Sequence, residues 1–500
     1  MNNYLNISNK EKSPKVIEDL VERFKINLPA YKSHRYKEQQ LREEFINPFF
    51  EALGWDVYNK SGAALAYRDV IHEDSIKMAG GTKAPDYCFT LAGTRMFFVE
   101  AKKPSVDIKG SVHPSYQLRR YAWSAKLPLS ILTDFEEFAV YESRKRPEKS
   151  DKASTERVVF LTYQDYIENW DEIASIFSKK AVLQGSFDRY IESVKAKRGT
   201  QEVDDAFLKE IETWRESLAK NIALRNPELT VSELNHSVQR TIDRIIFLRM
   251  CEDRGIERYG NLLSLLEKGN IYAHLCETYQ KADGKYNSGL FHFKKEKARS
   301  TIPDEITLNL LIDDKVLKDI INHIYYPESP YEFSVLSPVI LGNVYEQFLG
   351  KVIRLTAGHR AKIEEKPEVK KAGGVYYTPK YIVDYIVENT VGRLIEGKTP
   401  KQISELRVLD PACGSGSFLL GAYTKLLDYH LKYYQSRKNP KHYREQIFLG
   451  KNEEWYLTIK EKKRILLNNI YGVDIDNQAV EVTKLSLLLK VLTGESRDVF

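Results

Sequence analysis

The sequence predicts a multidomain protein of the α/β class. Its 500 residues are too many for one hydrophobic core, so roughly two to four domains are expected. The first part mixes helix and strand signals, the middle is predominantly helical, and the last part has strand–loop–helix order. We predict four segments: an α/β domain at 1–190, a helical connector at 191–357, a linker or exposed loop at 358–374, and an incomplete second α/β domain at 375–500.

Composition and charge are those of a soluble globular protein. The chain is 42% apolar and 29% charged, and its 76 basic and 70 acidic residues leave a net charge of +6. This balance is compatible with a nucleic-acid partner but does not argue for one. The four cysteines are far apart, which argues against a disulfide framework or zinc site and makes a reducing cytoplasm the expected location. The sequence predicts no signal peptide and no membrane span.

The first α/β segment has a readable order of elements. Apolar residues at helical spacing in "EEFINPFFEALGWDV" predict a helix that Gly54 ends. The stretch 85–104, "PDYCFTLAGTRMFFVEAKKP", has the pattern of two short strands joined by a tight turn. A helix is predicted in "YQLRRYAWSAKL", and two further strands are predicted in "LSILTDFEEFAVYES" around a turn at 134–136.

The strand pair at 85–104 predicts a candidate catalytic site. Side chains two apart on a strand share a face, so Glu100 and Lys102 project together at the end of the second strand. Asp86 begins the antiparallel neighbour and should lie beside them. Two carboxylates can hold Mg²⁺, and a lysine can orient water or offset charge during phosphodiester hydrolysis. The alternative is an ordinary hairpin with charged ends, because Glu-x-Lys alone carries little information.

The spacing of these residues resembles the PD-(D/E)xK nuclease motif. That resemblance implies that Asp86 and Glu100 are metal ligands and that Lys102 is catalytic. "QLRRY", which begins at Gln117, resembles the Q-x-x-x-Y helix of restriction nucleases, so Gln117 joins the candidate catalytic residues. In such nucleases an acid on the first helix often completes the metal site. Glu38 and Glu44 are both candidates here, and each could instead belong to a solvated helix face.

A second candidate site lies in "LRVLDPACGSGSFLLGAYTKLL". A short apolar strand meets Asp410, then a turn with Gly414 and Gly416, and then a helix from Phe418. Glycines let a backbone approach a ligand closely, and a helix N-terminus offers free N–H groups. The order is not the G-x-G-x-x-G of dinucleotide sites. It resembles the S-adenosylmethionine loop of amino-type DNA methyltransferases, which implies cofactor contacts from Asp410 to the ammonium and from Ala412, Cys413, Gly414, Gly416 and Phe418.

Two neighbouring segments support the same resemblance. "NNIYGVDIDNQAVEVTKLSLLL" resembles the second methyltransferase motif, in which Asp474 would accept hydrogen bonds from the ribose and Ile475 would pack on the adenine. The long spacing from Asp410 predicts an insertion or extra helices at about 430–465. Thr378 with Pro379 is a good helix N-cap in its own right, and the resemblance adds a contact from Thr378 to the methionine carboxylate.

One further motif match is rejected. The stretch Gly392–Thr399, "GRLIEGKT", fits the Walker A pattern, but a phosphate-binding loop should follow a strand and open a helix. This stretch continues a helical apolar pattern and is followed at once by Pro400, so it predicts a helix C-terminus with a glycine stop. No ATP site is expected in the chain.

Together the motifs resemble the N-terminal half of a type IIG restriction–modification enzyme. This resemblance implies a PD-(D/E)xK nuclease domain, a helical connector and the start of a Rossmann-like N6-adenine methyltransferase domain. It also implies Mg²⁺ and S-adenosylmethionine as cofactors, double-stranded DNA as substrate, and self-association as a route to double-strand cleavage. The chain lacks the Asn-Pro-Pro-Tyr motif that holds a flipped adenine, which would then lie beyond residue 500.

From these 500 residues alone we expect partial cofactor binding, without methylation or sequence choice. Two other functions remain open at this stage. One is a DNA methyltransferase of a phage-defence system whose nuclease fold is a degenerate DNA-binding arm. The other is a non-catalytic DNA-binding adaptor that senses S-adenosylmethionine.

Overall fold

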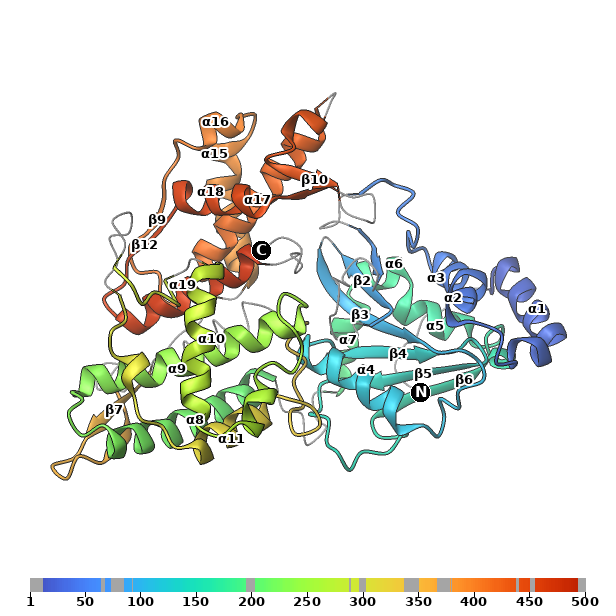
Figure 1. Ribbon diagram of the computed structural model, residues 1–500. Coiled ribbons are helices and arrows are strands. Elements are labelled where there is room, and N and C mark those ends of the chain that lie inside the picture. The colour runs from blue at the N-terminus through green and yellow to red at the C-terminus, as the bar shows by residue number, and fades with distance from the viewer. Residues whose placement is uncertain are drawn as a thin grey trace. The chain divides into compact units, whose positions relative to one another are not determined.

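The protein has a mixed α/β fold, as predicted, and forms two compact units (Figure 1). One unit comprises Met1–Lys77, Lys83–Val203 and Pro330–Val335, and the other comprises Met78–Thr82, Asp204–Ser329 and Leu336–Phe500. The computed structural model describes residues 12–63, 68–72, 85–91, 93–194, 203–286, 289–295, 303–336, 350–366, 378, 380–437, 440–449 and 455–492.

The first unit is built on a six-stranded sheet in sequence order. Its strands are β1 (Val70–His72), β2 (Tyr87–Leu91), β3 (Thr94–Ala101), β4 (Leu129–Thr133), β5 (Glu137–Glu142) and β6 (Arg157–Thr162). Strands β3 and β4 are parallel and are joined through α4 (Val112–Ser124), while the other neighbours are antiparallel. The predicted hairpin and the later strand pair are both confirmed.

Helices cover this sheet and supply much of its aromatic core. They are α1 (Lys15–Tyr31), α2 (Glu38–Leu41), a π-helical turn η1 (Arg42–Ile46), α3 (Asn47–Ala52), a 3₁₀ turn η4 (Tyr163–Asp165), α5 (Trp170–Phe177), α6 (Lys179–Leu183) and α7 (Ser186–Val194). Phe45, Phe49 and Phe50 are buried against the sheet. Gly54 adopts a φ of 86° and ends the predicted helix, because a left-handed backbone is accessible to glycine at little cost.

A short segment far along the chain also belongs to the first unit. We call Pro330–Val335 the returning segment. Arg120 Nη2 donates to the carbonyl of Tyr331 (2.8 Å), and the amide of Glu332 donates to Ser124 Oγ (2.9 Å). The ring of Tyr331 stacks on Trp123 with centroids 5.5 Å apart. These contacts fasten the returning segment to α4.

The second unit begins with a helical region. Its elements are α8 (Val203–Arg225), α9 (Val231–Asp253), η5 (Leu263–Glu267), α10 (Ile271–Tyr286), η6 (Thr307–Asn309) and α11 (Asp314–His323). A hairpin of β7 (Lys351–Leu355) and β8 (Ala361–Glu365) follows. Asn235 on α9 fixes this hairpin, because its side chain donates to the carbonyl of Ile353 (2.8 Å) and accepts from the Ile353 amide (3.0 Å).

The hairpin corrects the predicted linker at 358–374, and it also shortens the predicted helical region. Residues 361–365 form a strand instead of an open loop, while 367–374 lie outside the described residues. The high charge of this stretch suggested exposed chain. Strand pairing depends on backbone hydrogen bonds, however, so charged side chains can remain at the surface of a paired strand.

The rest of the second unit has the predicted strand–loop–helix order. Its elements are α14 (Lys380–Val387), η7 (Glu388–Gly392), α15 (Arg393–Ile395), α16 (Pro400–Ile403), β9 (Val408–Asp410), α17 (Ser417–Gln435), η8 (Pro440–Tyr443), β10 (Ile447–Leu449), β11 (Trp455–Leu457), α18 (Ile459–Asn469), β12 (Ile470–Gly472) and α19 (Asn477–Val491). Strands β9 and β12 are parallel neighbours, with Leu409 opposite Tyr471. The β10–β11 hairpin lies in the predicted insertion.

The stretch Gly392–Thr399 adopts the predicted helix termination. It includes the short α15 and then Gly397, whose φ of 70° turns the chain out of the helix. Thr399 next caps α16, because its side chain accepts a hydrogen bond from the amide of Gln402 (3.3 Å). The segment therefore lacks the strand–loop–helix geometry that holds phosphates.

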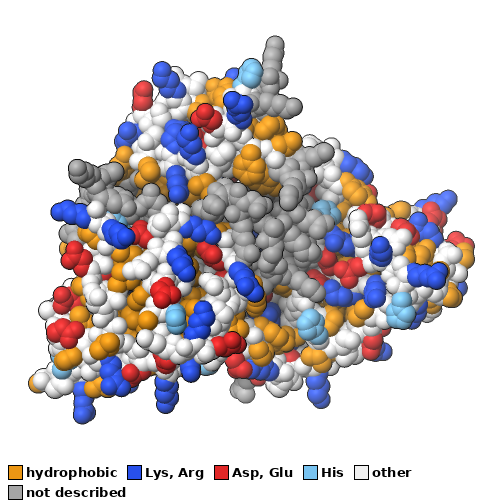
Figure 2. All heavy atoms as spheres, in the orientation of Figure 1, with side chains coloured by type: hydrophobic (Ala, Val, Ile, Leu, Met, Phe, Trp, Pro, Cys, Tyr) orange, Lys and Arg blue, Asp and Glu red, His pale blue; other side chains and the backbone are white. Residues whose placement is uncertain are grey.

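The surface carries mixed charge. Figure 2 shows basic and acidic side chains interspersed over the visible face of the described residues, consistent with the small net charge of +6. Across the part of the chain that the structure describes, none of the helices combines the length and apolar character needed to span a bilayer.

Candidate functional sites

The hairpin of β2 and β3 brings the predicted catalytic trio together. The register pairs Tyr87 with Val99, which sets Asp86 beside the end of β3. Asp86 and Glu100 are each only 4% exposed. Asp86 Oδ2 accepts a hydrogen bond from the Ala101 amide (2.7 Å), and Lys102 Nζ donates to Glu100 Oε1 (2.5 Å) and to the Ala101 carbonyl (2.9 Å).

Burial and mutual repulsion make this carboxylate pair costly to ionise. Burial raises the pKa of Glu100 to about 7, with the charge of Asp86 adding to the rise and Lys102 opposing it. Burial also raises the pKa of Asp86, against the charges of Arg42 and Lys102. Although burial lowers the pKa of Lys102, the charge and hydrogen bond of Glu100 outweigh it, so the net shift is upward. Two buried carboxylates in this state favour an additional cation.

Arg42 is a residue of this site that the sequence analysis missed. It lies at the start of the π-helical turn η1, and its Nη1 is 3.2 Å from Asp86 Oδ1. Its Nε donates to the hydroxyl of Tyr87 (3.3 Å), and its guanidinium lies 4.9 Å from the centre of that ring. Tyr87 in turn donates to Asn47 Oδ1 (2.7 Å). π-Helical turns are frequent at functional sites, and here the turn presents Arg42 to the hairpin.

The two candidate helix acids have different surroundings. The charge of Glu38 contributes to raising the pKa values of Asp86, Glu100 and Lys102, so Glu38 lies within electrostatic reach of the trio. Glu44 instead accepts a hydrogen bond from the hydroxyl of Tyr36 (3.4 Å), and its charge helps to raise the pKa of Tyr36 after the larger effect of burial.

Gln117 lies on α4 and connects indirectly to the trio. Burial raises the pKa of Tyr121, with the charges of Glu332 and Glu100 adding to the rise and a hydrogen bond with Gln117 opposing it. Gln117 therefore contacts a tyrosine that senses the charge of Glu100. The structure thus groups Gln117 with the hairpin acids through Tyr121.

The donor set fits a hard divalent cation. Among the described residues, no group of three His, Cys, Asp or Glu side chains is close enough to hold a metal by itself. Mg²⁺, however, is usually held by one or two carboxylates together with water. Glu100 Oε2 is buried without a hydrogen-bond partner among the described residues, so its lone pairs are open to such an ion.

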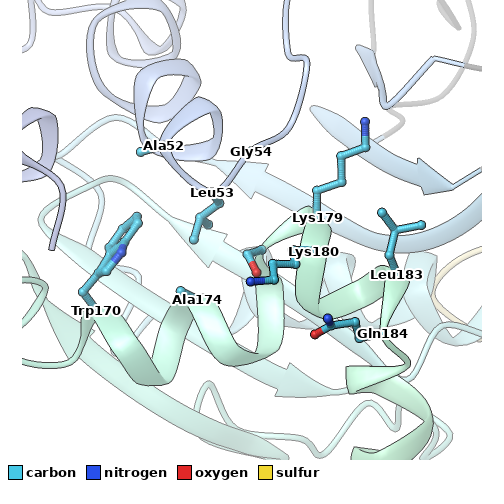
Figure 3. Close-up of a pocket in the computed structure, with 10 residues that line it drawn as sticks. Ala52, Leu53, Gly54, Trp170, Ala174, Lys179, Lys180, Leu183 and Gln184 are labelled. Carbon is cyan, nitrogen blue, oxygen red and sulfur yellow. The ribbon is translucent and has the colours of Figure 1, made fainter. Parts of the chain in front are cut away.

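The same unit carries a surface hollow of about 570 Å³ that is separate from the trio. It lies between the end of α3 and helices α5 and α6, and Leu53, Trp170, Lys179, Lys180 and Gln184 line it (Figure 3). None of its lining residues is a predicted site residue. Lys179, whose side chain points away from the other lining residues, is already paired with Asp69 at 2.6 Å. The hollow therefore adds nothing to the candidate catalytic site.

The second candidate site lies where β9 and β12 end side by side. The amide of Val473 donates to the carbonyl of Asp410 (2.9 Å), and the amide of Cys413 donates to the carbonyl of Val473 (2.9 Å). The carboxylate of Asp410 accepts from the Ala412 amide (3.1 Å). Asp474 Oδ2 accepts from the Gly414 amide (2.8 Å). The two predicted acids thus lie at and just beyond the ends of adjacent strands, and both accept hydrogen bonds from the loop after β9.

Gly416 is required for a close approach in this loop. Its φ is 85°, and a Cβ atom there would lie 2.7 Å from Thr483 Cγ2 on α19. Thr483 also donates from its hydroxyl to the carbonyl of Gly414 (2.8 Å). Phe418 packs against the hydrophobic core behind the loop. The sequence identified the glycines but not Thr483.

The remaining cofactor candidates are placed as follows. Ile475 is fully exposed after β12, at 103% of its reference area, which leaves its apolar side chain free to meet a ligand. Cys413 is buried and Ala412 is exposed. Thr378 is half-buried, but Pro379 lies outside the described residues, so the predicted helix cap stays a prediction.

Comparison with known proteins agrees with these motifs. Residues 394–495 match the family described as "MmeI, DNA-methyltransferase domain". The "Type II restriction enzyme and methyltransferase RM.Eco57I" of Escherichia coli is 36% identical over 485 residues, which cover 96% of this chain and 47% of that protein. The "Putative type II restriction enzyme and methyltransferase RM.MjaORFECS2P" of Methanocaldococcus jannaschii is 26% identical, over 67% of this chain and 32% of that protein.

A solved structure described as "cryoEM structure DrdV-DNA complex" is 14% identical to this chain. The match covers 96% of this chain and 39% of the chain in that structure. Its TM-score of 0.30 is too low to assign details of the fold.

These relatives combine a restriction enzyme and a methyltransferase in one polypeptide, and that is the class of protein to which the motifs point. The 36% identity runs along nearly the whole chain. The chain is therefore similar to the type II restriction enzymes and methyltransferases that these relatives represent. It spans about half the length of the first relative and about a third of the second.

Proposed function

We propose that this chain carries the DNA-cleaving site and part of the methyl-donor site of a bifunctional restriction–modification enzyme. Double-stranded DNA is the proposed substrate, and the methyl group is proposed to go to N6 of adenine. The buried pair Asp86 and Glu100 beside Lys102 carries the proposal, because buried carboxylates whose pKa values are raised cluster at functional sites. In this interpretation 1–190 is a PD-(D/E)xK nuclease domain, 191–357 is a connector, and 375–500 begins a Rossmann-like domain.

The trio at the end of the hairpin and two nearby helix residues have proposed roles in phosphodiester hydrolysis. Mg²⁺ bound there would polarise the phosphate and acidify a water molecule. Asp86 and Glu100 would hold the ion together with water, and Glu38 is the helix acid proposed to assist them, because its charge reaches the trio. Lys102 orients the attacking water and offsets the charge that develops on the phosphate. Arg42 holds the carboxylate of Asp86 in place.

The cleavage proposal is tested with two substitutions in the trio. Asp86→Ala and Lys102→Ala should each lower cleavage of supercoiled plasmid in Mg²⁺ by at least about a hundredfold. The matched control is Lys152→Ala, an exposed lysine of the same unit. Wild-type rates of cleavage in either trio variant would overturn the assignment and would favour a degenerate, DNA-binding nuclease arm.

The choice between the helix acids has its own test. Calcium supports binding at many magnesium sites through the same oxygen ligands. Calorimetric titration of Ca²⁺ should therefore show weaker binding for Glu38→Gln, while Glu44→Gln binds like the wild type. The reverse result would transfer the assisting role to Glu44.

The loop after β9 is the proposed S-adenosylmethionine site. Asp410 is proposed to pair with the ammonium of the methionine portion, and Thr378 with its carboxylate. Asp474 is proposed to accept hydrogen bonds from the ribose hydroxyls, with Ile475 packing on the adenine. The support is the loop geometry, the exposure of Ile475 and the family match over 394–495.

The cofactor proposal is tested by calorimetric titration. S-adenosylmethionine should bind Asp410→Ala protein at least about tenfold more weakly than wild type, because the ammonium loses its counter-ion. Glu405→Ala is the matched control, since Glu405 is exposed shortly before β9. Equal affinity of the Asp410→Ala protein and the wild type would contradict the assignment.

A further inference from the structure

Asp474 and Asp476, which follow β12, are held by a series of contacts that begins outside the methyltransferase-like region. Asp474 Oδ1 accepts a hydrogen bond from the amide of Asp476 (2.8 Å), while its other oxygen holds the Gly414 amide. Asp476 Oδ1 accepts from the amide of Gln478 (2.9 Å) and so caps α19. The orientation of Asp474 therefore depends on the position of Asp476.

Lys366, which directly follows β8, pairs with the second carboxylate oxygen of Asp476. Lys366 Nζ donates to Asp476 Oδ2 in an ion pair. The two side chains are only 21% and 29% exposed, so the pair is partly shielded from solvent. Arg215 on α8 is also near, because the charges of Glu212 and Asp476 oppose the burial that lowers the pKa of Arg215 to about 10.

Lys366 itself is firmly placed by the helical region. Its amide donates to the carbonyl of Gly350 (2.8 Å), which closes the hairpin after β8. At the other strand, Arg215 Nη2 donates to the carbonyl of Lys351 (3.0 Å), and Lys351 pairs with Glu212. Asn235 fixes the middle of β7 to α9. These contacts connect the hairpin, and with it Lys366, to α8 and α9.

We propose that Lys366 is a positioning residue for the cofactor site, acting through Asp476 to hold Asp474 and the Gly414 amide. This inference rests on the proposed S-adenosylmethionine site. Residue 366 precedes the matched region 394–495, so the cofactor pocket depends on a residue contributed by the hairpin that the helical region carries. Groups that contact a ligand are precise only when the surrounding contacts fix them.

The test compares two lysines of the same hairpin. Lys366→Met keeps the length and apolar stem of the side chain but removes its charge. Lys362→Met is the matched control, because Lys362 is 66% exposed and pairs with Glu364 on its own strand. In the full chain, S-adenosylmethionine should bind the Lys366→Met protein about three- to tenfold more weakly. The Lys362→Met protein should bind like the wild type, and Lys366→Arg should restore most of the affinity.

A double-mutant cycle separates positioning from general damage. Asp476→Asn keeps the oxygen that caps α19 but removes the charge. If Lys366 acts through Asp476, the double variant should bind no more weakly than the weaker single variant. Losses that multiply in the double variant, or equal affinity of Lys366→Met and wild type, would overturn the proposal.

A second measurement separates this inference from the proposed cofactor. If the wild-type chain fails to bind S-adenosylmethionine, the proposed cofactor site is wrong, and hydrogen exchange of the ligand-free protein then tests the positioning. The amide of Gly414 should exchange several-fold faster in the Lys366→Met protein than in the Lys362→Met protein. Equal exchange in the two variants would overturn the positioning role.

Discussion

Replacing Glu100 with glutamine should stabilise the first unit above neutral pH while abolishing cleavage. In the folded protein without a divalent cation, burial and Asp86 raise the pKa of Glu100 from 4.5 to about 7. When folding raises the pKa of a carboxyl group, the folded protein is more stable with that group protonated than with it ionised. Stability is therefore full below about pH 4.5 and is lost as the pH rises through 7. Glutamine at this position removes that loss.

The magnitude follows from the width of the pKa shift. Each pKa unit corresponds to about 1.4 kcal/mol, so ionising Glu100 should cost the wild type about 2.5 kcal/mol of unfolding free energy between pH 5 and pH 8. The variant escapes this loss but leaves Lys102 without its charged partner. That second effect offsets part of the gain at every pH, so the pH dependence of the difference is the quantity to measure.

Calorimetry of wild type and Glu100→Gln at pH 5 and pH 8 in chelator is the direct assay. The melting temperature of the variant relative to wild type should rise by about 5–10 °C between the two pH values. Glu148→Gln removes the same formal charge at an exposed position and controls for net charge. A difference in melting temperature that is the same at both pH values would refute the raised pKa. Added Mg²⁺ at pH 8 should stabilise only the wild type.

Three further predictions concern other parts of the chain. Arg42→Met should lower the unfolding free energy by about 1–3 kcal/mol in thermal melts, because buried Asp86 loses its ion pair, and Arg42→Lys should recover part of it. Gly416→Ala should weaken S-adenosylmethionine binding at least about tenfold by calorimetric titration. The positive φ of residue 416 is strained for alanine, and the added methyl group would clash with Thr483 on α19. Burial raises the pKa of Asp304, but hydrogen bonds and the charge of Arg244 hold it below its ordinary value, so Asp304→Asn should lower the melting temperature at pH 7, with the deficit shrinking as the pH falls below about 4.

Local patterns predicted the parts of the candidate sites that depend on neighbouring residues. The two-residue period of a strand places Glu100 and Lys102 on one face, and the structure joins them by a hydrogen bond. The order of strand, glycines and helix after Arg407 likewise follows from local chemistry. In both places the required geometry is encoded within about twenty residues, so a single sequence is sufficient to predict it.

Contacts between distant residues could not be predicted in this way. Arg42 reaches Asp86 only because a π-helical turn and the sheet bring the two residues together. The sequence of neither segment predicts this ion pair. Lys366 and Asp476 lie far apart in the sequence, and no sequence pattern links them, so their ion pair could not be predicted. The strand at 361–365 was missed for another reason, since its pairing partner, β7, falls within the segment predicted as a helical connector.

The returning segment makes the first unit discontinuous in the gene. Pro330–Val335 supplies a stacking partner for Trp123 and a hydrogen bond to Ser124, yet it is encoded after the helical region of the other unit. A fragment that stops at residue 203 would uncover the ring of Trp123 and leave α4 without its partner. Recombination that exchanges this unit between relatives must therefore transfer two separate pieces of coding sequence, which restricts how freely the unit can be inherited as a module.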